Sequence, residues 1–144
     1  MPVVGLNFTR IEVERKGALK GNVNIHNNVA IKSVEKSDVD ISSDKQLVAK
    51  FNFEFTSKYE PELGKIIFNG NLLFMDEQKK IKEVIDTWKK EKKVEKELMT
   101  TILNTILSKC NIQALILSDS VNLPPPIPLP KVEVNAKESN SYIG

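Results

Sequence analysis

The chain has only one cysteine and one histidine among its 144 residues, Cys110 and His26. A zinc site of the Cys/His type needs three or four such ligands, so a single chain cannot build one. A framework of disulfides is excluded for the same reason, and a lone thiol fits a reducing compartment. The scarcity of these two side chains therefore removes the chemistries that need them in clusters.

Long apolar runs and phosphate-binding glycine motifs are also missing. No stretch reaches the ~18 consecutive apolar residues of a membrane span, and the first residues lack the basic and apolar regions of a signal peptide. The 6 glycines match no phosphate-loop spacing. We therefore expect a cytoplasmic protein with no membrane span, no targeting segment and no cofactor.

Side chains that could serve in catalysis are present but scattered. Cys110 stands among leucines and isoleucines, as a small buried hydrophobe does, and His26 lies beside asparagines in a predicted strand where we expect it to be exposed. A nucleophile needs a neighbouring base, and these two residues lie in different predicted elements. Asp38, Asp40 and Asp44 lack the glycine and terminal glutamate of a calcium loop, so we expect an ordinary loop there. The sequence favours a protein that is not an enzyme and holds no metal.

Charge is nearly balanced, with 21 basic and 19 acidic side chains and a net charge of +2. The densest stretch, residues 76–97, mixes eight lysines with seven acidic residues, which is typical of a solvated helix face. The chain has only two arginines, Arg10 and Arg15, although arginine is the preferred residue for bidentate contacts with nucleic acid. Charge therefore favours neither nucleic acid nor a membrane surface as a partner.

The alternation of apolar and polar residues predicts strands over the first 75 residues. It is clearest in residues 47–56, where aromatic side chains occupy one phase: Phe51, Phe53 and Phe55. Residues 65–75 repeat the pattern, and Gly70 stands where an apolar side chain is due, which indicates a bulge or a close backbone approach. Pro61 and Gly64 mark a loop over residues 57–64, so the two strands form a hairpin.

Two further strands are predicted before this hairpin, at residues 3–13 and 23–34. The apolar phase slips between Phe8 and Ile11 in the first strand, so we expect a bulge there. Asn27 interrupts the apolar phase of the second strand, so we expect a bulge or a bend at that position. Residues 16–22 contain two glycines and form the turn between these strands. The expected order is four strands in an antiparallel meander.

The periodicity changes to that of helices after Met75. Asp76 is the expected N-cap, and one apolar stripe follows at helical spacing: Ile81, Val84, Ile85 and Trp88. A longer helix is predicted over residues 94–117. Because residues 98–130 carry only two charges, Lys109 and Asp119, we expect one helix face on the sheet and another on a partner chain or exposed for binding.

Five prolines occur among residues 122–130, which excludes a helix and favours an extended polyproline arm. The interleaved Leu123, Ile127 and Leu129 favour an arm that packs on an apolar surface. Residues 131–134 alternate as a short edge strand does, and residues 135–144 have the composition of a flexible tail. We therefore expect one domain over residues 1–134, followed by this tail.

The most specific part of the sequence is residues 110–117, Cys-Asn-Ile-Gln-Ala-Leu-Ile-Leu, and then residues 123–132, Leu-Pro-Pro-Pro-Ile-Pro-Leu-Pro-Lys-Val. This end of a main helix, followed by a run of proline and leucine, resembles the SecB export-chaperone family. The strand with three phenylalanines falls where that family has an alternating apolar strand. The resemblance covers residues 3–134 in architecture.

This resemblance implies an α+β fold, in which a four-stranded antiparallel sheet precedes a short charged helix, a long apolar helix and a proline-rich arm. It also implies a tetramer built as a dimer of dimers, in which sheets pair across protomers and helices pack at the subunit interface. The acidic surface with which the family engages the SecA motor is replaced here by a near-neutral, lysine-rich one. The chain therefore looks more like the divergent SecB-like proteins, which include stand-alone chaperones and chaperones of toxin–antitoxin pairs.

The resulting hypothesis is an ATP-independent holdase that binds unfolded or precursor proteins in apolar surface grooves. The expected groove residues are Phe8, Ile102, Ile106, Leu123, Ile127 and Leu129. Two alternatives stay open. One is an RNA- or ribosome-associated adaptor that uses the lysines of residues 79–93, and the other is a structural oligomerisation module without a groove.

Overall fold

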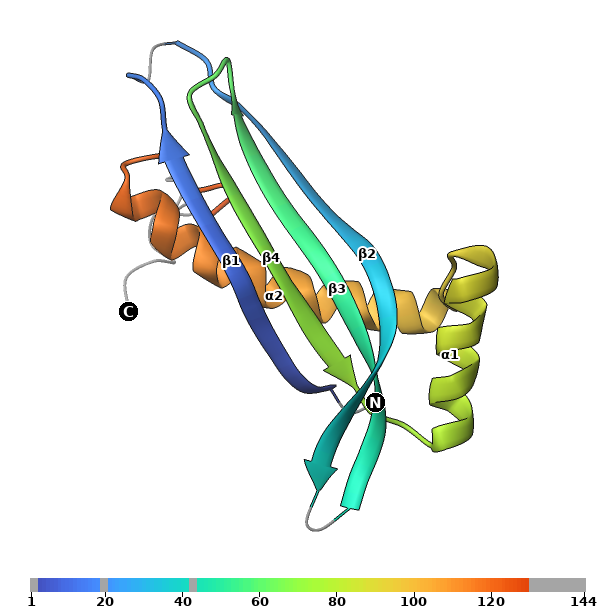
Figure 1. Cartoon of the computed structure of the whole chain (residues 1–144). Helices are drawn as coiled ribbons and strands as arrows, with labels where there is room; N and C mark the ends of the chain where they lie inside the picture. Colours follow the sequence, from blue (N-terminus) through green and yellow to red (C-terminus); the bar gives the residue numbers. More distant parts are fainter. Residues whose placement is uncertain (1–2, 19–20, 42–43, 130–144) are drawn as a thin grey trace, which may run out of the picture.

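The computed structural model describes residues 3–18, 21–41 and 44–129. Four strands come first and two helices follow: β1 (Val3–Arg15), β2 (Asn24–Ile41), β3 (Asp44–Glu60), β4 (Gly64–Phe74), α1 (Gln78–Glu91) and α2 (Lys96–Ser120). All strand pairs are antiparallel. The predicted α+β class is confirmed, with the sheet, the short charged helix, the long apolar helix and the arm in the expected order (Figure 1). The predicted strand over residues 131–134 and the tail lie outside the described residues.

The order of strands in the sheet is β1-β4-β3-β2, so the predicted meander is wrong in its first step. β2, β3 and β4 follow one another as a meander, but β1 pairs with the far edge of β4 instead of with β2. This position lets Phe8 of β1 pack on Phe68 of β4, with ring centroids 5.1 Å apart. β1 and β2 therefore lie on opposite edges of the sheet and do not form a hairpin.

β3 and β2 both run further than the sequence pattern predicts. β3 continues through Ser57 and Tyr59, which keep the alternation and are buried, so only residues 61–63 form the loop before β4. β2 continues to Ile41, and Asp38 pairs with Leu47 inside the ladder. The loop expected around the aspartates is thus wrong, because long cross-strand pairing outweighs their low strand propensity.

The bulge predicted in β1 is confirmed, but β2 has no bulge at Asn27. The register of β1 against β4 shifts between Phe8 and Arg10, as the slip in the apolar phase predicts. Asn27, however, pairs in register with Ser57, and the bulge of β2 lies between Ile31 and Ser33. Asn27 therefore stands in the apolar phase for a reason other than a bulge, because its side chain donates a hydrogen bond to the Pro126 carbonyl.

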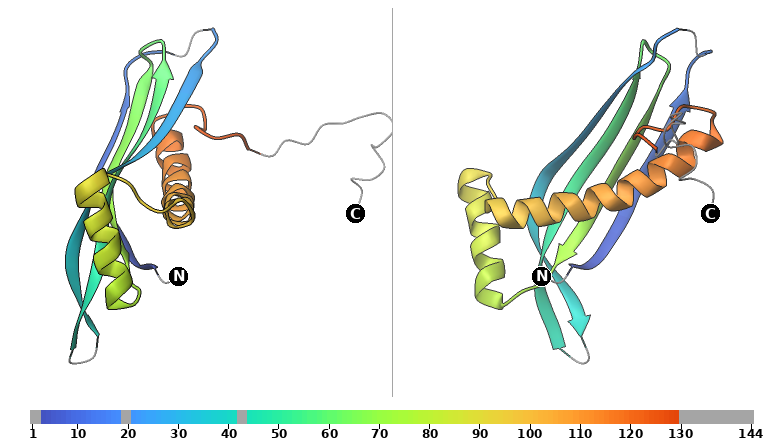
Figure 2. Two further views of the ribbon diagram at one scale, coloured as in Figure 1. Left: turned by 90° about the vertical axis from the view of Figure 1, so that its right-hand side faces the viewer. Right: turned by 180° about the vertical axis from the view of Figure 1, so that it is seen from behind.

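The core lies on one face of the sheet, between the sheet and α2 (Figure 2). The inward side chains of β3 and β4 are fully or almost fully buried: Phe51, Phe53, Phe55, Ile66, Phe68, Leu72 and Phe74. Aromatic rings fill much of this layer, and those of Phe55 and Phe68 stack with centroids 5.5 Å apart. The phenylalanine strand is therefore ordinary core under a helix.

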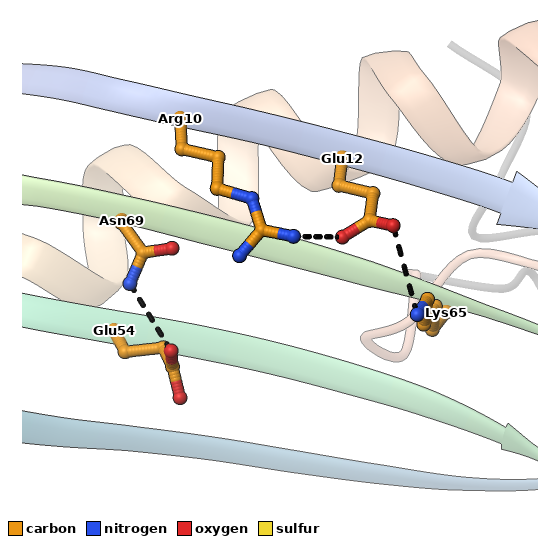
Figure 3. A network of polar contacts seen from close by, with 5 residues as sticks. All are labelled: Arg10, Glu12, Glu54, Lys65 and Asn69. Atoms are coloured by element: carbon orange, nitrogen blue, oxygen red, sulfur yellow. Dashed lines mark hydrogen bonds and ion pairs between the residues drawn. The ribbon is translucent and has the colours of Figure 1, made fainter.

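The face of the sheet opposite α2 carries a network of polar side chains (Figure 3). Glu12 accepts a hydrogen bond from Arg10 at 2.6 Å and forms an ion pair with Lys65 at 3.6 Å. Asn69 donates to Glu54 across the neighbouring strands at 3.1 Å. This face is the solvated side of an antiparallel sheet, and His26, exposed as expected, lies in the same phase of β2.

Both helices form near the predicted places. α1 packs its buried stripe, Ile81, Val84 and Ile85, against β3 and β2. The expected N-cap is wrong by one residue, because Glu77 holds the cap position and Asp76 only accepts a hydrogen bond from the Glu77 backbone N–H at 2.7 Å. Neither helix of the described chain is long and apolar enough to cross a membrane.

α2 places a single stripe on the sheet at intervals of four residues: Leu98, Ile102, Ile106, Cys110, Ala114 and Ser118. Cys110 has no exposed surface, as expected for a small hydrophobe, and burial raises the pKa of its thiol to about 12. The outward side of the same helix leaves Ile112 and Ile116 exposed. The helix is thus apolar on more than the face that the sheet covers.

Gly70 provides a test of the packing between β1 and β4. A methyl group at this position would collide with the Asn7 carbonyl oxygen and lie 2.8 Å from the ring of Phe53. We expect Gly70→Ala to lower the free energy of unfolding by about 2 kcal/mol, because neither the strand backbone nor the packed ring can retreat. Urea unfolding measures this change.

Gly17→Ala is the matched control, because a methyl group at Gly17 has nothing within 4 Å. Its expected effect is close to zero. Equal unfolding free energies for the two variants would contradict the close approach of β1 to β4.

Candidate functional site

The chain reverses direction after α2 and continues as an extended arm, which we define as residues 122–129. Asn122 takes a left-handed conformation with φ 58° and donates its N–H to the Asp119 carbonyl at 3.1 Å. The Leu123 N–H then donates to the Ser118 carbonyl at 2.8 Å, which closes the end of the helix. Leu123 is buried, so the arm returns onto the core as predicted.

Side chains from three different strands hold the backbone of the arm. Arg15 of β1 donates to the Asn122 carbonyl at 3.3 Å, and Tyr59 of β3 donates its hydroxyl proton to the Pro124 carbonyl. Asn27 of β2 donates to the Pro126 carbonyl at 2.7 Å. The three acceptors alternate along the arm, at residues 122, 124 and 126. Because proline has no N–H, the arm cannot join the sheet as a strand, and side-chain donors replace the ladder.

The position of Asn27 requires a side chain that both donates and accepts a hydrogen bond. Its Oδ1 accepts a hydrogen bond from Ser57 Oγ at 2.6 Å, and its Nδ2 donates to Pro126. Ser57 is fully buried and lies opposite Asn27 in the ladder. The interruption of the apolar phase is therefore a polar link from β3 through β2 to the arm, and this explains why no bulge forms there.

A groove of about 490 Å³ opens between the last turns of α2 and the arm. We call it the arm groove, and its lining residues are Leu115, Ile116, Ser118, Asp119, Ser120, Leu123, Pro125 and Leu129. Ile116 is 56% exposed and Leu129 47%, so two large apolar side chains stand open on its two walls. The groove has room for side chains of another polypeptide, and its polar end is formed by the helix terminus.

The structure places the six predicted groove residues in three environments. Ile102 and Ile106 are fully buried under the sheet and have no exposed surface in this chain. Phe8 is half-buried and packs on Phe68. Of the three arm residues, the buried Leu123 and the exposed Leu129 line the groove at the end of α2, whereas Ile127 is half-buried and is not among its lining residues.

Several residues of this region are not among those predicted from the sequence. Leu115, Ile116 and Pro125 line the groove, while Asn27 and Tyr59 hold the arm. The sequence carried a signal for Ile116, since the helix is too apolar for one buried face. It carried another for Asn27, a polar residue in an apolar phase, but nothing identified the partner of Asn27.

The comparisons with known proteins agree with this geometry. No family model matches the chain, and no curated protein matches its sequence. A solved structure does match: the SecB-like chaperone of Mycobacterium tuberculosis, in complex with a ChAD peptide from the HigA1 antitoxin. The TM-score is 0.54, the sequences are 12% identical, and the match covers 93% of this chain and 91% of that one.

The chain has the SecB-like fold. The likeness extends over almost the whole of both chains. At 12% identity it concerns the fold alone. The SecB resemblance predicted from the helix end and the proline run is thereby confirmed at the level of fold.

The lysine-rich segment around α1 has a different character. Lys80 donates to Glu95 at 2.9 Å, which raises its pKa, and the Lys92 ammonium lies 5.8 Å from the ring centroid of Trp88. Another shallow hollow beside the helix mixes Lys90 with Glu83 and Glu91. Basic and acidic groups are thus interleaved on its surface instead of forming one basic face.

The hydrogen bond of Tyr59 predicts how the stability of the protein changes at alkaline pH. Its hydroxyl must keep its proton to donate to the Pro124 carbonyl, and burial raises the pKa of the phenol from 10.0 to about 12. The stabilisation that this raised pKa provides is complete below pH 10 and is lost as the pH rises through 12. We expect the difference in unfolding free energy between wild type and Tyr59→Phe to shrink over this interval, starting from about 1 kcal/mol at pH 8.

Urea unfolding of both chains between pH 8 and 12 measures that difference. Comparison of the two chains cancels the titration of the lysines, which they share. A difference that stays constant through pH 12 would contradict the hydrogen bond from Tyr59 to the arm.

Proposed function

We propose that this protein is an ATP-independent holdase chaperone that binds unfolded or unexported polypeptides in the cytoplasm. The observation that carries the proposal is the arm groove on a SecB-like fold, with Ile116 and Leu129 exposed on opposite walls. Exposed apolar side chains that line a concave surface are typical of sites that bind another polypeptide. The neighbour with this fold is a chaperone solved with a bound peptide, which supports polypeptide as the class of ligand.

The expected affinity of one groove for a client is low, so binding depends on several grooves that engage the same client. Burial of apolar surface contributes about 25 cal/mol per Å², so one client side chain contributes about 2 kcal/mol. A single groove of about 490 Å³ takes few such side chains, and a long unfolded client gains affinity by engaging several grooves at once. We therefore include in the proposal a tetramer of the SecB kind, a dimer of dimers, whose protomers each contribute grooves.

The exposed face of α2 supports this assembly. Ile112 is 60% exposed and lies one turn before Ile116, so the outward side of the helix offers an apolar strip that a second copy could cover. This strip fits the expectation that helices pack at the subunit interface. The predicted residues Ile102 and Ile106, buried here, enter the client site only if the sheet and α2 separate, and we place the client on the arm instead.

The two alternatives make different predictions. An RNA- or ribosome-associated adaptor would depend on lysine contacts with phosphate, whose affinity falls steeply with salt. The interleaved charges around α1 do not favour it. A structural oligomerisation module would assemble but bind neither unfolded protein nor RNA.

The direct test is light scattering of a chemically unfolded protein that aggregates on dilution, with and without this chain, and without nucleotide. We expect suppression at near-stoichiometric amounts that persists at high salt, because apolar burial is insensitive to screening. Absence of suppression at excess would contradict the holdase, and suppression that disappears with salt would favour the adaptor.

Substitutions on the arm test the site. Leu129→Asp and Ile127→Asp place a charge on the arm groove and beside it, and we expect each to weaken client binding about tenfold because a client cannot bury a carboxylate. Val4→Asp is the matched control, since Val4 is 42% exposed against 47% for Leu129 but lies on β1, away from the arm. The measurement is the amount of each variant that halves aggregation, set beside its thermal midpoint.

Equal losses of client binding in the control and the arm variants would contradict the assignment. So would losses in the arm variants that only follow their loss of thermal stability.

A further inference from the structure

The arm forms one wall of the groove, but its backbone has few N–H groups that could fix its position by hydrogen bonds. Three of its residues, Pro124, Pro125 and Pro126, are consecutive prolines without an N–H. The described hydrogen bonds between the arm and the sheet all run from a strand side chain to an arm carbonyl. The distance of this wall from α2, and hence the width of the groove, therefore depends on those side chains.

Asn27 and Tyr59 hold the part of the arm that faces the groove. Their acceptors, the carbonyls of Pro124 and Pro126, flank Pro125, which lines the groove. Arg15 acts further back, where its two contacts at 3.3 and 3.4 Å reach the carbonyls that follow the helix. Asn27 and Tyr59 are thus the donors nearest to the wall itself.

The buried Ser57 fixes the orientation of the Asn27 side-chain amide. Ser57 Oγ has no exposed surface and donates to Asn27 Oδ1, so the amide must turn its Nδ2 towards the arm. Neither an apolar residue nor an ionised aspartate could serve here, since neither can donate. The side chain therefore has a directional role that packing alone does not require.

We propose that Asn27 and Tyr59 are positioning residues of the client site, which hold the arm at the separation from α2 that receives an extended client. This inference rests on the proposed chaperone function. A rigid wall lowers the entropy lost when a client binds, so loosening it weakens binding even where the fold persists. Neither residue has to touch the client.

The experiment compares full-length variants in their affinity for a permanently unfolded probe, fluorescently labelled reduced and carboxymethylated α-lactalbumin. The variants are Asn27→Asp, Asn27→Ala and Tyr59→Phe, measured at a temperature where circular dichroism shows each to be folded. Asn52→Asp is the matched control, because Asn52 makes a similar bond to Ser33 Oγ at 2.8 Å, but on the face opposite α2. It introduces the same charge without touching the arm.

We expect Asn27→Ala and Tyr59→Phe to bind the probe about tenfold more weakly, the factor that corresponds to one lost hydrogen bond. Asn27→Asp should be at least as weak, because an ionised carboxylate accepts hydrogen bonds but cannot donate one to the Pro126 carbonyl.

The outcomes distinguish failure of the proposed chaperone function from failure of the positioning role alone. A wild-type chain that does not bind the probe removes the chaperone proposal and this role with it. If wild type binds and the arm-holding variants bind equally well, only the positioning role is overturned. It is also overturned if Asn52→Asp loses as much affinity as Asn27→Asp.

Discussion

The structure depends on the need to cover one apolar face of a twisted sheet with a single helix. The inward side chains of β3 and β4 form a continuous aromatic and aliphatic layer, and water must be kept from all of it. α2 has 25 residues and is about 37 Å long, but it crosses the strands obliquely (Figure 2). The end of the sheet near Tyr59 is left for another segment, and the arm covers it with Leu123 and Pro126.

The composition of the covering segment has consequences for function. The arm crosses the face of the sheet, where its carbonyls accept hydrogen bonds from Arg15, Tyr59 and Asn27 on three different strands, and its prolines have no N–H to pair. An arm that is anchored on its inner side keeps its outer side free, and the groove against α2 results. In this account the same feature that completes the core also creates the surface for a client.

Much of the fold was predictable because its causes are local. The alternation around Phe51–Phe55 and the slip after Phe8 follow from the period of a strand, and the helices follow from their own period. The place of β1 beside β4 is not local, and neither is the bond from Asn27 to Pro126, 99 residues away. The groove was recognised only in part for the same reason. The four-residue repeat of Ile102 and Ile106 marks the stripe that packs on the sheet, and Leu115 and Ile116 meet the arm only once the chain has turned back.

The most direct test of the account is to map where an unfolded client touches the protein, using isoleucine and leucine methyl resonances of the full chain. The account predicts that a client perturbs the methyl groups of Leu115, Ile116 and Leu129 most strongly. Ile67 and Leu73, which lie in the outward phase of β4 on the face opposite α2, should stay unchanged. Perturbations centred on that open face, with the groove unaffected by a bound client, would contradict it.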